Sequence, residues 1–192
     1  MSVSKKRLVV GISGASGVIL GIELLKMLQV LSDYETHLVV SRGAELTIAA
    51  ETEYSVGEVL RLADYTYDIK NIGASIASGT FKTAGMIIVP CSMKTAAGVA
   101  CGYSDNLLLR AADVTIKEKR NLVVVPRESP LSTIHLKNML VLAEAGAIII
   151  PPMVTYYNKP LGFEDMNRHI IGKILDKFGI EARGFTRWGE NF

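Results

Sequence analysis

A charged pair, Arg127 and Glu128, directly follows the apolar run Leu122–Val125 and is flanked by Pro126 and Pro130. One interpretation is an exposed salt bridge, which would contribute at most ~1 kcal/mol to stability. The other is chemistry on a phosphorylated substrate, in which the arginine binds the phosphate. Like-charge repulsion from that phosphate would favour the protonated form of the neighbouring carboxyl group. On this hypothesis Glu128 acts as a general acid.

A glycine-rich segment follows the first apolar run and reads Gly-Ile-Ser-Gly-Ala-Ser-Gly at 11–17. Glycines allow backbone N–H groups to approach an anion, and the helix expected next would add the positive end of its dipole. The spacing is neither that of a dinucleotide fingerprint nor that of a P-loop. A tight turn without a ligand is the alternative, but the hydroxyls of Ser13 and Ser16 favour a phosphorylated or flavin-like ligand.

Small polar residues follow two further apolar runs. Ser41 comes after His37–Val40, and its residue type and position favour a helix N-cap. Ser92, Met93 and Thr95 come after Met86–Pro90 and could line a flat aromatic ligand. Cys91 has no histidine or cationic motif beside it in the sequence, so we interpret it as structural.

Tyr157 lies just beyond Pro151-Pro152-Met153, where it could donate a hydrogen bond to an anion or simply pack. Four cations could neutralise one or two phosphates: Arg110, Lys117, Arg127 and Lys173. The sequence shows no carboxylate cluster of the kind that holds Mg²⁺. We therefore expect phosphate chemistry without a metal.

These residues need a scaffold, and the pattern of apolar runs predicts one. Expected strands are Leu8–Ile12, His37–Val40, Met86–Pro90, Leu122–Val125 and Ala147–Ile150; expected helices are Val18–Leu31, Arg42–Thr52, Asp105–Lys119 with Asp105 as N-cap, His135–Ala145 and Phe163–Phe178. The least regular part, Ile69–Lys82, is interpreted as a loop insertion. The alternation predicts an α/β fold of Rossmann-like type: a doubly wound parallel sheet in a single domain, residues 1–192. In such sheets ligands bind beyond the carboxyl ends of the strands.

The composition excludes several classes of protein. The 192 residues contain 21 basic and 19 acidic side chains, a balance unlike that of an electrostatic nucleic-acid binder. Two cysteines cannot form a disulfide framework, and neither a signal-peptide core nor a membrane span is apparent. We expect a cytoplasmic protein with no membrane partner. Apolar residues make up 49% of the chain, which predicts strands buried on both faces and a homo-oligomer.

Several longer segments resemble the flavin prenyltransferases, the UbiX-like family. They are Gly-Ile-Ser-Gly-Ala-Ser-Gly at 11–17, Pro-Cys-Ser-Met-Lys-Thr at 90–95, Gly-Tyr-Ser-Asp-Asn-Leu-Leu-Leu-Arg-Ala-Ala-Asp-Val at 102–114, Ile-Lys-Glu-Lys-Arg at 116–120, Val-Pro-Arg-Glu-Ser-Pro-Leu at 125–131, His-Leu-Lys-Asn-Met-Leu at 135–140, Pro-Pro-Met at 151–153 and Arg-Trp-Gly-Glu at 187–190. The resemblance implies a flavoprotein, usually a homododecamer, that binds FMN where protomers meet. It also implies transfer of a dimethylallyl group from dimethylallyl monophosphate to N5 and C6 of reduced FMN. The prenylated FMN would serve a UbiD-type decarboxylase, and no metal is needed.

The resemblance also implies roles for individual residues. Cofactor contacts would come from Gly14, Ala15, Ser16, Ser41, Ser92, Met93, Thr95 and Arg110. Ser16 would assist proton movement near flavin N5, and Ser41 would contact the FMN phosphate, contrary to the N-cap interpretation above. The substrate phosphate would be held by Lys117, Arg127, Tyr157 and Lys173, with Glu128 as acid and later base and Trp188 beside the prenyl tail. Ser16, Lys117, Glu128 and Tyr157 form the implied catalytic set.

The sequence departs from the family pattern at Lys173, where many relatives have arginine. A lysine is a point charge and cannot grip a phosphate in the bidentate manner of a guanidinium group. The segment from Leu62 to Phe81 resembles the branch that serves hydroxyarylic acid decarboxylases, which implies a phenolic-acid client. The alternative is a flavin-binding carrier or an FMN-dependent decarboxylase with a histidine base. The candidate base, His135, is interpreted instead as capping or packing a helix.

Overall fold

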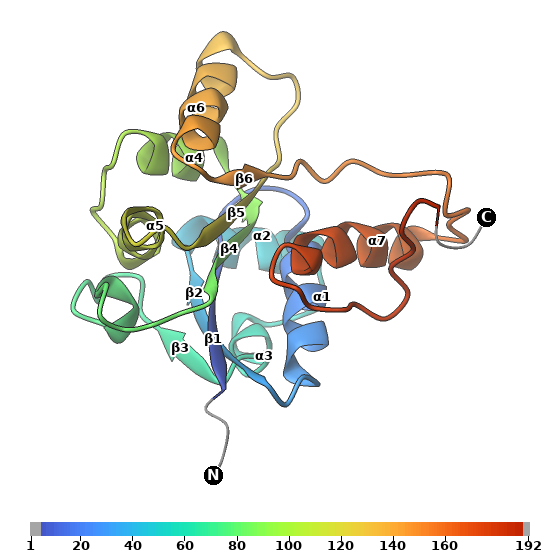
Figure 1. Cartoon of the computed structure of the whole chain (residues 1–192), viewed down its shortest axis with the longest axis horizontal. Helices are drawn as coiled ribbons and strands as arrows, with labels where there is room; N and C mark the ends of the chain where they lie inside the picture. The colour runs from blue at the N-terminus through green and yellow to red at the C-terminus, as the bar shows by residue number, and fades with distance from the viewer. Residues whose placement is uncertain (1–4, 190–192) are drawn as a thin grey trace.

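The computed structural model describes residues 5–189 and is built on one six-stranded parallel sheet (Figure 1). The strands are β1 (Lys6–Ile12), β2 (Tyr34–Val40), β3 (Tyr65–Tyr67), β4 (Gly85–Cys91), β5 (Asn121–Pro126) and β6 (Ile148–Ile149). Their spatial order is β3-β2-β1-β4-β5-β6. The chain therefore winds outward in one direction from β1 and in the other from β4, which is the doubly wound order of Rossmann-like folds. The predicted fold class is confirmed.

Helices cover both faces of the sheet (Figure 1). They are α1 (Val18–Gln29), α2 (Arg42–Glu51), α3 (Val56–Leu60), α4 (Met93–Ala100), α5 (Leu107–Lys117), α6 (Thr133–Glu144) and α7 (Phe163–Asp176), with a 3-10 turn, η1 (Ser75–Ala77). One core forms between the sheet and α1, α2, α3 and α7. A second core forms between the opposite face and α4, α5, α6 and η1.

Alternate residues of each central strand feed these two cores. Val10 packs on the α1 side, whereas Val9 packs on the α5 side. All seven residues of β4 are buried, as expected for a parallel strand covered on both faces. This double burial explains why the strands are continuous apolar runs rather than alternating patterns, and it confirms that prediction.

The predicted elements exist, but some details were wrong. Asp105 does not cap α5; the cap is Asn106, whose side chain accepts a hydrogen bond from the backbone N–H of Leu109 at 3.1 Å. The sequence interpretation also omitted β3, α3 and α4. The segment 69–82 is largely irregular as expected, although it contains η1 and buries Ile76 in the second core. The predicted domain, 1–192, includes residues 1–4 and 190–192, which lie outside the described range, and its extent stays a prediction.

Helix α6 projects away from the rest of the molecule at one end of the sheet (Figure 1). Leu142 is its one buried residue, and Ile134, Leu136 and Leu140 are more than half exposed. An apolar surface of this kind usually marks a protein–protein contact. Within residues 5–189, no helix has both the length and the apolar character required to cross a bilayer.

Candidate active site

The loops that follow β1 and β4 meet at the point where the winding direction of the sheet reverses. Ser13 joins them: its hydroxyl donates to the carbonyl oxygen of Pro90 at 3.0 Å and accepts from the backbone N–H of Ser92 at 2.8 Å. Ser13 is buried, so its hydroxyl fastens the two loops together rather than facing a ligand. By contrast, the Ser16 hydroxyl is half-buried and has no hydrogen-bond partner among residues 5–189. It is therefore available to a bound molecule.

Close backbone contact explains two of the glycines near this crevice. A Cβ atom on Gly14 would lie 2.8 Å from the Cα and carbonyl carbon of Gly43, near the start of α2. The loop after β1 can therefore press against α2 because neither residue has a side chain. Gly17 has a φ of 92°, and its N–H donates to Glu51 Oε2 at 2.8 Å. These contacts hold the segment 14–17 against α2, with Gly14 beside the amino end of the helix and Gly17 hydrogen-bonded to its last residue, Glu51.

Two helices begin at this edge of the sheet, each with a serine as N-cap. Ser41 Oγ accepts from the Ala44 N–H at 3.1 Å, so the N-cap interpretation is confirmed, and its own proton remains free to reach an anion. Ser92 Oγ accepts from the Thr95 N–H at 3.2 Å and donates to Thr95 Oγ1 at 3.1 Å. Met93 is buried in the second core beneath these polar groups. Exposed N–H groups and helix dipoles make such helix starts favourable for phosphate.

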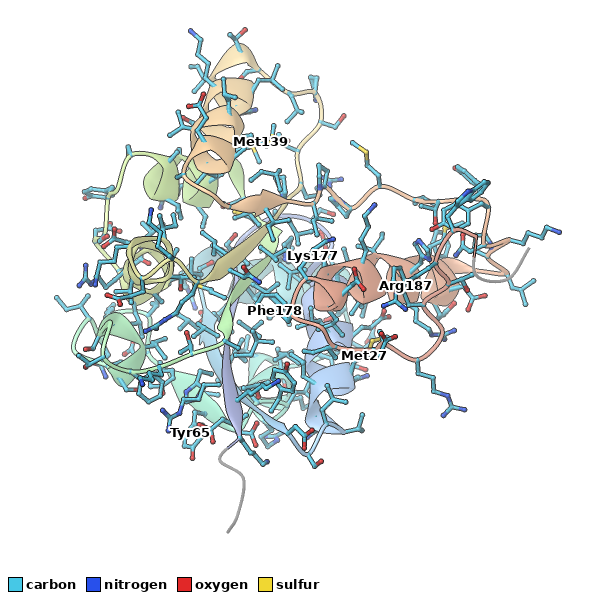
Figure 2. All side chains as sticks on the ribbon, viewed as in Figure 1. Met27, Tyr65, Met139, Lys177, Phe178 and Arg187 are labelled. Atoms are coloured by element: carbon cyan, nitrogen blue, oxygen red, sulfur yellow. The ribbon has the colours of Figure 1, made fainter. Side chains whose placement is uncertain are left out.

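Arg127 and Glu128 border a cavity of about 250 Å³ at the carboxyl end of β5. Its lining residues are Pro126, Arg127, Glu128, Leu131, Met139, Pro151, Pro152 and Met153. The Arg127 N–H donates to the Cys91 carbonyl at 3.1 Å, and the Glu128 carboxylate accepts from the Ser129 N–H at 3.1 Å. The two side chains form no ion pair with each other or with any other described residue. The salt-bridge interpretation is therefore wrong, and both residues border an apolar-walled hollow. Met139, which is labelled in Figure 2, contributes to the wall from α6.

A second cavity has a volume of about 200 Å³ and shares the lining residues Pro151 and Met153 with the first. The two cavities are therefore neighbours. Lys173 and His169 of α7 border this second cavity. Tyr157 lies close by, because its hydroxyl is 3.1 Å from His169 Nε2. Lys173, Tyr157, Arg127 and Glu128 thus lie around the segment that follows β6.

The chain after α7 returns along that helix, where Arg187 is located (Figures 1 and 2). Arg187 donates to Asp176 Oδ1 at 2.7 Å and to Glu181, and these ion pairs fasten the returning segment. Trp188 is thereby held edge-to-face with Tyr157, with ring centroids 5.1 Å apart. Trp188 is 71% exposed, so its indole is accessible to a ligand or to another chain.

Arg110 and Lys117 lie elsewhere, on α5. Arg110 donates to the Ala77 carbonyl at 3.2 Å and pairs with Asp113 at 2.7 Å, while Lys117 pairs with Glu118. Lys117 precedes the amino end of β5, whereas Glu128 follows its carboxyl end. The six residues of β5 span about 20 Å at ~3.3 Å per residue. One chain therefore does not bring Lys117 and Glu128 into the same pocket.

The environments of other reactive groups limit what they can do. Burial raises the pKa of the Cys91 thiol to about 12, which supports its structural interpretation. His135 accepts from the Ser132 N–H at 3.2 Å in a capping box that begins α6, so its predicted capping role is confirmed. No group of three or more His, Cys, Asp or Glu side chains within 5–189 is arranged to hold a metal ion.

The sequence analysis missed His169. It is buried on α7, four residues before Lys173, and burial together with the nearby Lys173 ammonium lowers its pKa. The helical spacing of His169 and Lys173 was a signal that could have placed both on one face of α7. The partnership with Tyr157 could not be recognised, because it depends on the path of the segment between β6 and α7.

Comparison with known proteins identifies the family. The sequence profile of the Flavoprotein family matches residues 1–178. A probable UbiX-like flavin prenyltransferase from Sedimentibacter hydroxybenzoicus is 53% identical over 182 residues, covering 95% of this chain and 96% of the relative. This chain belongs to the UbiX-like flavin prenyltransferase family.

Two solved structures of UbiX-like proteins have the same fold. AnUbiX (PadA1), determined in complex with FMN and dimethylallyl pyrophosphate, superposes with a TM-score of 0.94 at 47% identity, covering 96% of this chain and 98% of that one. A dodecameric FMN-dependent UbiX-like decarboxylase from Escherichia coli O157:H7 superposes with a TM-score of 0.93 at 49% identity, covering 95% and 98%. The family that the sequence segments indicated is thus confirmed along nearly the whole chain.

Proposed function

We propose that this UbiX-like flavin prenyltransferase transfers the dimethylallyl group of dimethylallyl monophosphate to N5 and C6 of reduced FMN. The prenylated FMN would then serve a UbiD-type decarboxylase, with an aromatic or phenolic acid as the client's substrate. The observation that carries the proposal is that Arg127 and Glu128 line one hollow and Lys173 lines the adjoining one, where the Tyr157 hydroxyl lies 3.1 Å from His169 in the wall. The family membership of the chain supports the same conclusion.

The crevice fits FMN. The Ser16 hydroxyl is available there, and Gly14 and Ala15 expose backbone beside two helix starts. We assign the FMN phosphate to the amino end of α2 and Ser41, where free N–H groups favour an anion. Ser92 and Thr95 would line the flavin from the start of α4. When bound and reduced, FMN supplies the nucleophilic nitrogen and carbon that accept the prenyl group.

The residues around Glu128 are suited to removing a phosphate leaving group. Arg127, Lys173 and the Tyr157 hydroxyl would bind its oxygens, so the charge that develops as the allylic C–O bond breaks is neutralised. Glu128 would donate a proton to the departing phosphate and later act as a base. Ser16 would relay a proton beside the flavin, and the Trp188 indole would stabilise positive charge on the allyl group through its π face.

Lys117 enters this site only if it is shared between chains. In one chain β5 lies between Lys117 and Glu128, which supports a homo-oligomer in which α5 of one copy faces the phosphate pocket of another. The exposed apolar side chains of α6 provide surface for such contacts. We propose a dodecamer, the assembly named for the Escherichia coli O157:H7 protein.

The test is an anaerobic incubation of the purified protein with reduced FMN and dimethylallyl monophosphate, followed by mass spectrometry of the flavin. We expect the flavin to gain one dimethylallyl unit, and we expect Glu128→Gln to form little product. The pyrophosphate should be assayed in parallel, because AnUbiX was determined with that compound. An unmodified flavin from folded, FMN-loaded protein with either donor would refute the proposal.

A second assay addresses the partner. The product should activate an apo UbiD-type decarboxylase toward a phenolic acid, whereas FMN alone should not. If the protein instead released CO₂ from a carboxylic acid without its client, the alternative of an FMN-dependent decarboxylase would be favoured.

A further inference from the structure

His169 is buried in an aromatic cluster beside the proposed phosphate pocket. Its exposed fraction is 2%, and its Nε2 atom lies 3.1 Å from the Tyr157 hydroxyl. The Tyr157 ring meets the imidazole edge-on at a centroid distance of 5.4 Å, and Phe185 packs at 5.0 Å. These contacts leave the imidazole little freedom to rotate. The orientation of the hydrogen bond to Tyr157 therefore depends on which ring nitrogen carries the proton.

The other ring nitrogen, Nδ1, is buried and has no hydrogen-bond partner among the described residues. Burial and the nearby Lys173 lower the pKa of His169, so the neutral ring is favoured near pH 7. A proton on Nδ1 would create a buried N–H donor without an acceptor, which is costly and rare in folded proteins. An unprotonated Nδ1 is a buried acceptor without a donor, which folded proteins tolerate more often than an orphaned N–H, so we place the proton on Nε2.

The tautomer determines what Tyr157 can do. With its proton on Nε2, His169 donates to the Tyr157 oxygen, so Tyr157 must direct its own O–H elsewhere. Among the described residues, the Tyr157 hydroxyl can donate to the Thr186 carbonyl oxygen. The distance between these two oxygen atoms is 3.4 Å, which is long for a hydrogen bond from a hydroxyl. The Tyr157 proton is thus held in a weak interaction that a phosphate oxygen can replace with a shorter, charge-assisted one.

We propose that His169 is a positioning residue that fixes Tyr157 as a hydrogen-bond donor toward the phosphate of the prenyl substrate. The inference rests on the proposed function, because it requires a phosphate ligand beside Tyr157. Without the His169 donor, the Tyr157 hydroxyl is free to rotate, and its oxygen can accept from other donors instead of presenting its proton. The role is exerted through Tyr157: His169 borders the second cavity, but its Nε2 atom meets the Tyr157 hydroxyl and its Nδ1 atom is buried.

A double-mutant cycle tests this role. His169→Leu removes the donor, whereas His169→Gln places an amide N–H within reach of the same oxygen. Each is made in the wild-type protein and in Tyr157→Phe, and the KM for dimethylallyl monophosphate, kcat and the FMN content are measured. Phe185→Leu serves as the matched control, because it alters packing on the imidazole and leaves the hydrogen bond in place.

We expect His169→Leu to raise the KM about five- to tenfold, the effect of losing one hydrogen bond, with FMN content unchanged. His169→Gln should restore the KM to within about twofold, and in the Tyr157→Phe background His169→Leu should change it by less than about twofold. Equal losses in both backgrounds, or a Phe185→Leu effect as large as that of His169→Leu, would overturn the positioning role while leaving the prenyl transfer intact. If the wild-type protein neither binds the substrate in calorimetry nor forms product, the proposed function fails, and the positioning role with it.

Discussion

The proposed sharing of the active site between chains makes a sharp prediction about mixed oligomers. Lys117→Ala and Glu128→Ala should each abolish most of the prenyl transfer when every subunit carries the change. Mixing the two variants should restore activity, because some sites then combine a wild-type Lys117 from one chain with a wild-type Glu128 from another. If both residues served a site within one chain, every site would carry one defect and mixing would restore nothing.

The expected fraction of restored activity follows from the distance between the two residues and from the statistics of assembly. About 20 Å of β5 separates the two positions, whereas a side chain that clamps a phosphate must come within ~3 Å of its oxygens. Even an extended lysine bridges only about 6 Å of that gap at ~1.5 Å per bond. With equal amounts of the two subunits and random assembly, about a quarter of the sites contain both wild-type residues.

The assay is co-expression of the two variants with different affinity tags, followed by tandem purification and measurement of prenylated FMN. We expect mixed oligomers to reach about a quarter of wild-type activity, and each variant alone to stay near background. A matched control pairs Glu128→Ala with Arg127→Ala, two defects on the same side of the site, for which no restoration is expected. Mixed Lys117→Ala and Glu128→Ala oligomers that remain inactive would refute the reasoning, provided that size-exclusion chromatography shows intact assemblies.

Three further predictions concern the crevice and the core. Ser16→Ala should retain FMN but slow turnover, because a relay hydroxyl is lost while the backbone cradle remains; purified protein without its flavin absorbance would contradict this. Gly14→Ala should lower the free energy of unfolding by about 1–3 kcal/mol, because the new methyl group meets Gly43 at 2.8 Å; thermal melts should show no such loss for Gly73→Ala, where the nearest atom is 3.6 Å away. Burial lowers the pKa of His37 despite the Glu35 carboxylate beside it, so the unfolded chain takes up this proton first as the pH falls. Urea titrations should therefore show stability falling from pH 7.5 to 5.5 and a shallower slope for His37→Phe, whereas stability that rises on acidification would count against the assignment.

The amino-acid sequence predicted the sheet well because each central strand is buried on both faces and appears as an uninterrupted apolar run. β3 was missed because it has three residues and lies at the sheet edge, where burial imposes little pattern. α4 was missed because it has only eight residues and includes Gly98, a residue type with low helix propensity.

The carboxyl-end residues were predictable for a topological reason, since parallel strands deliver their ends to one edge. The same topology separates Lys117 from Glu128, because the predicted strand at 122–125 lies between them, whereas the family resemblance implied one phosphate site for both. Ser13 illustrates a second limit. A serine at this position could either contact a ligand or join two loops. The hydrogen bonds to Pro90 and Ser92 show that Ser13 joins two loops.

The backbone contact between Gly14 and Gly43 has a consequence for anyone who wishes to redesign this enzyme. A loop and a helix that touch without intervening side chains cannot be diversified one at a time, so a mutant library that randomises either glycine should consist mostly of inactive clones. The pocket wall formed by Leu131, Met139 and Met153 carries no such constraint, since flexible side chains there can be shortened independently. Enlarging the range of isoprenoid donors should therefore begin at that wall, with both glycines left unchanged.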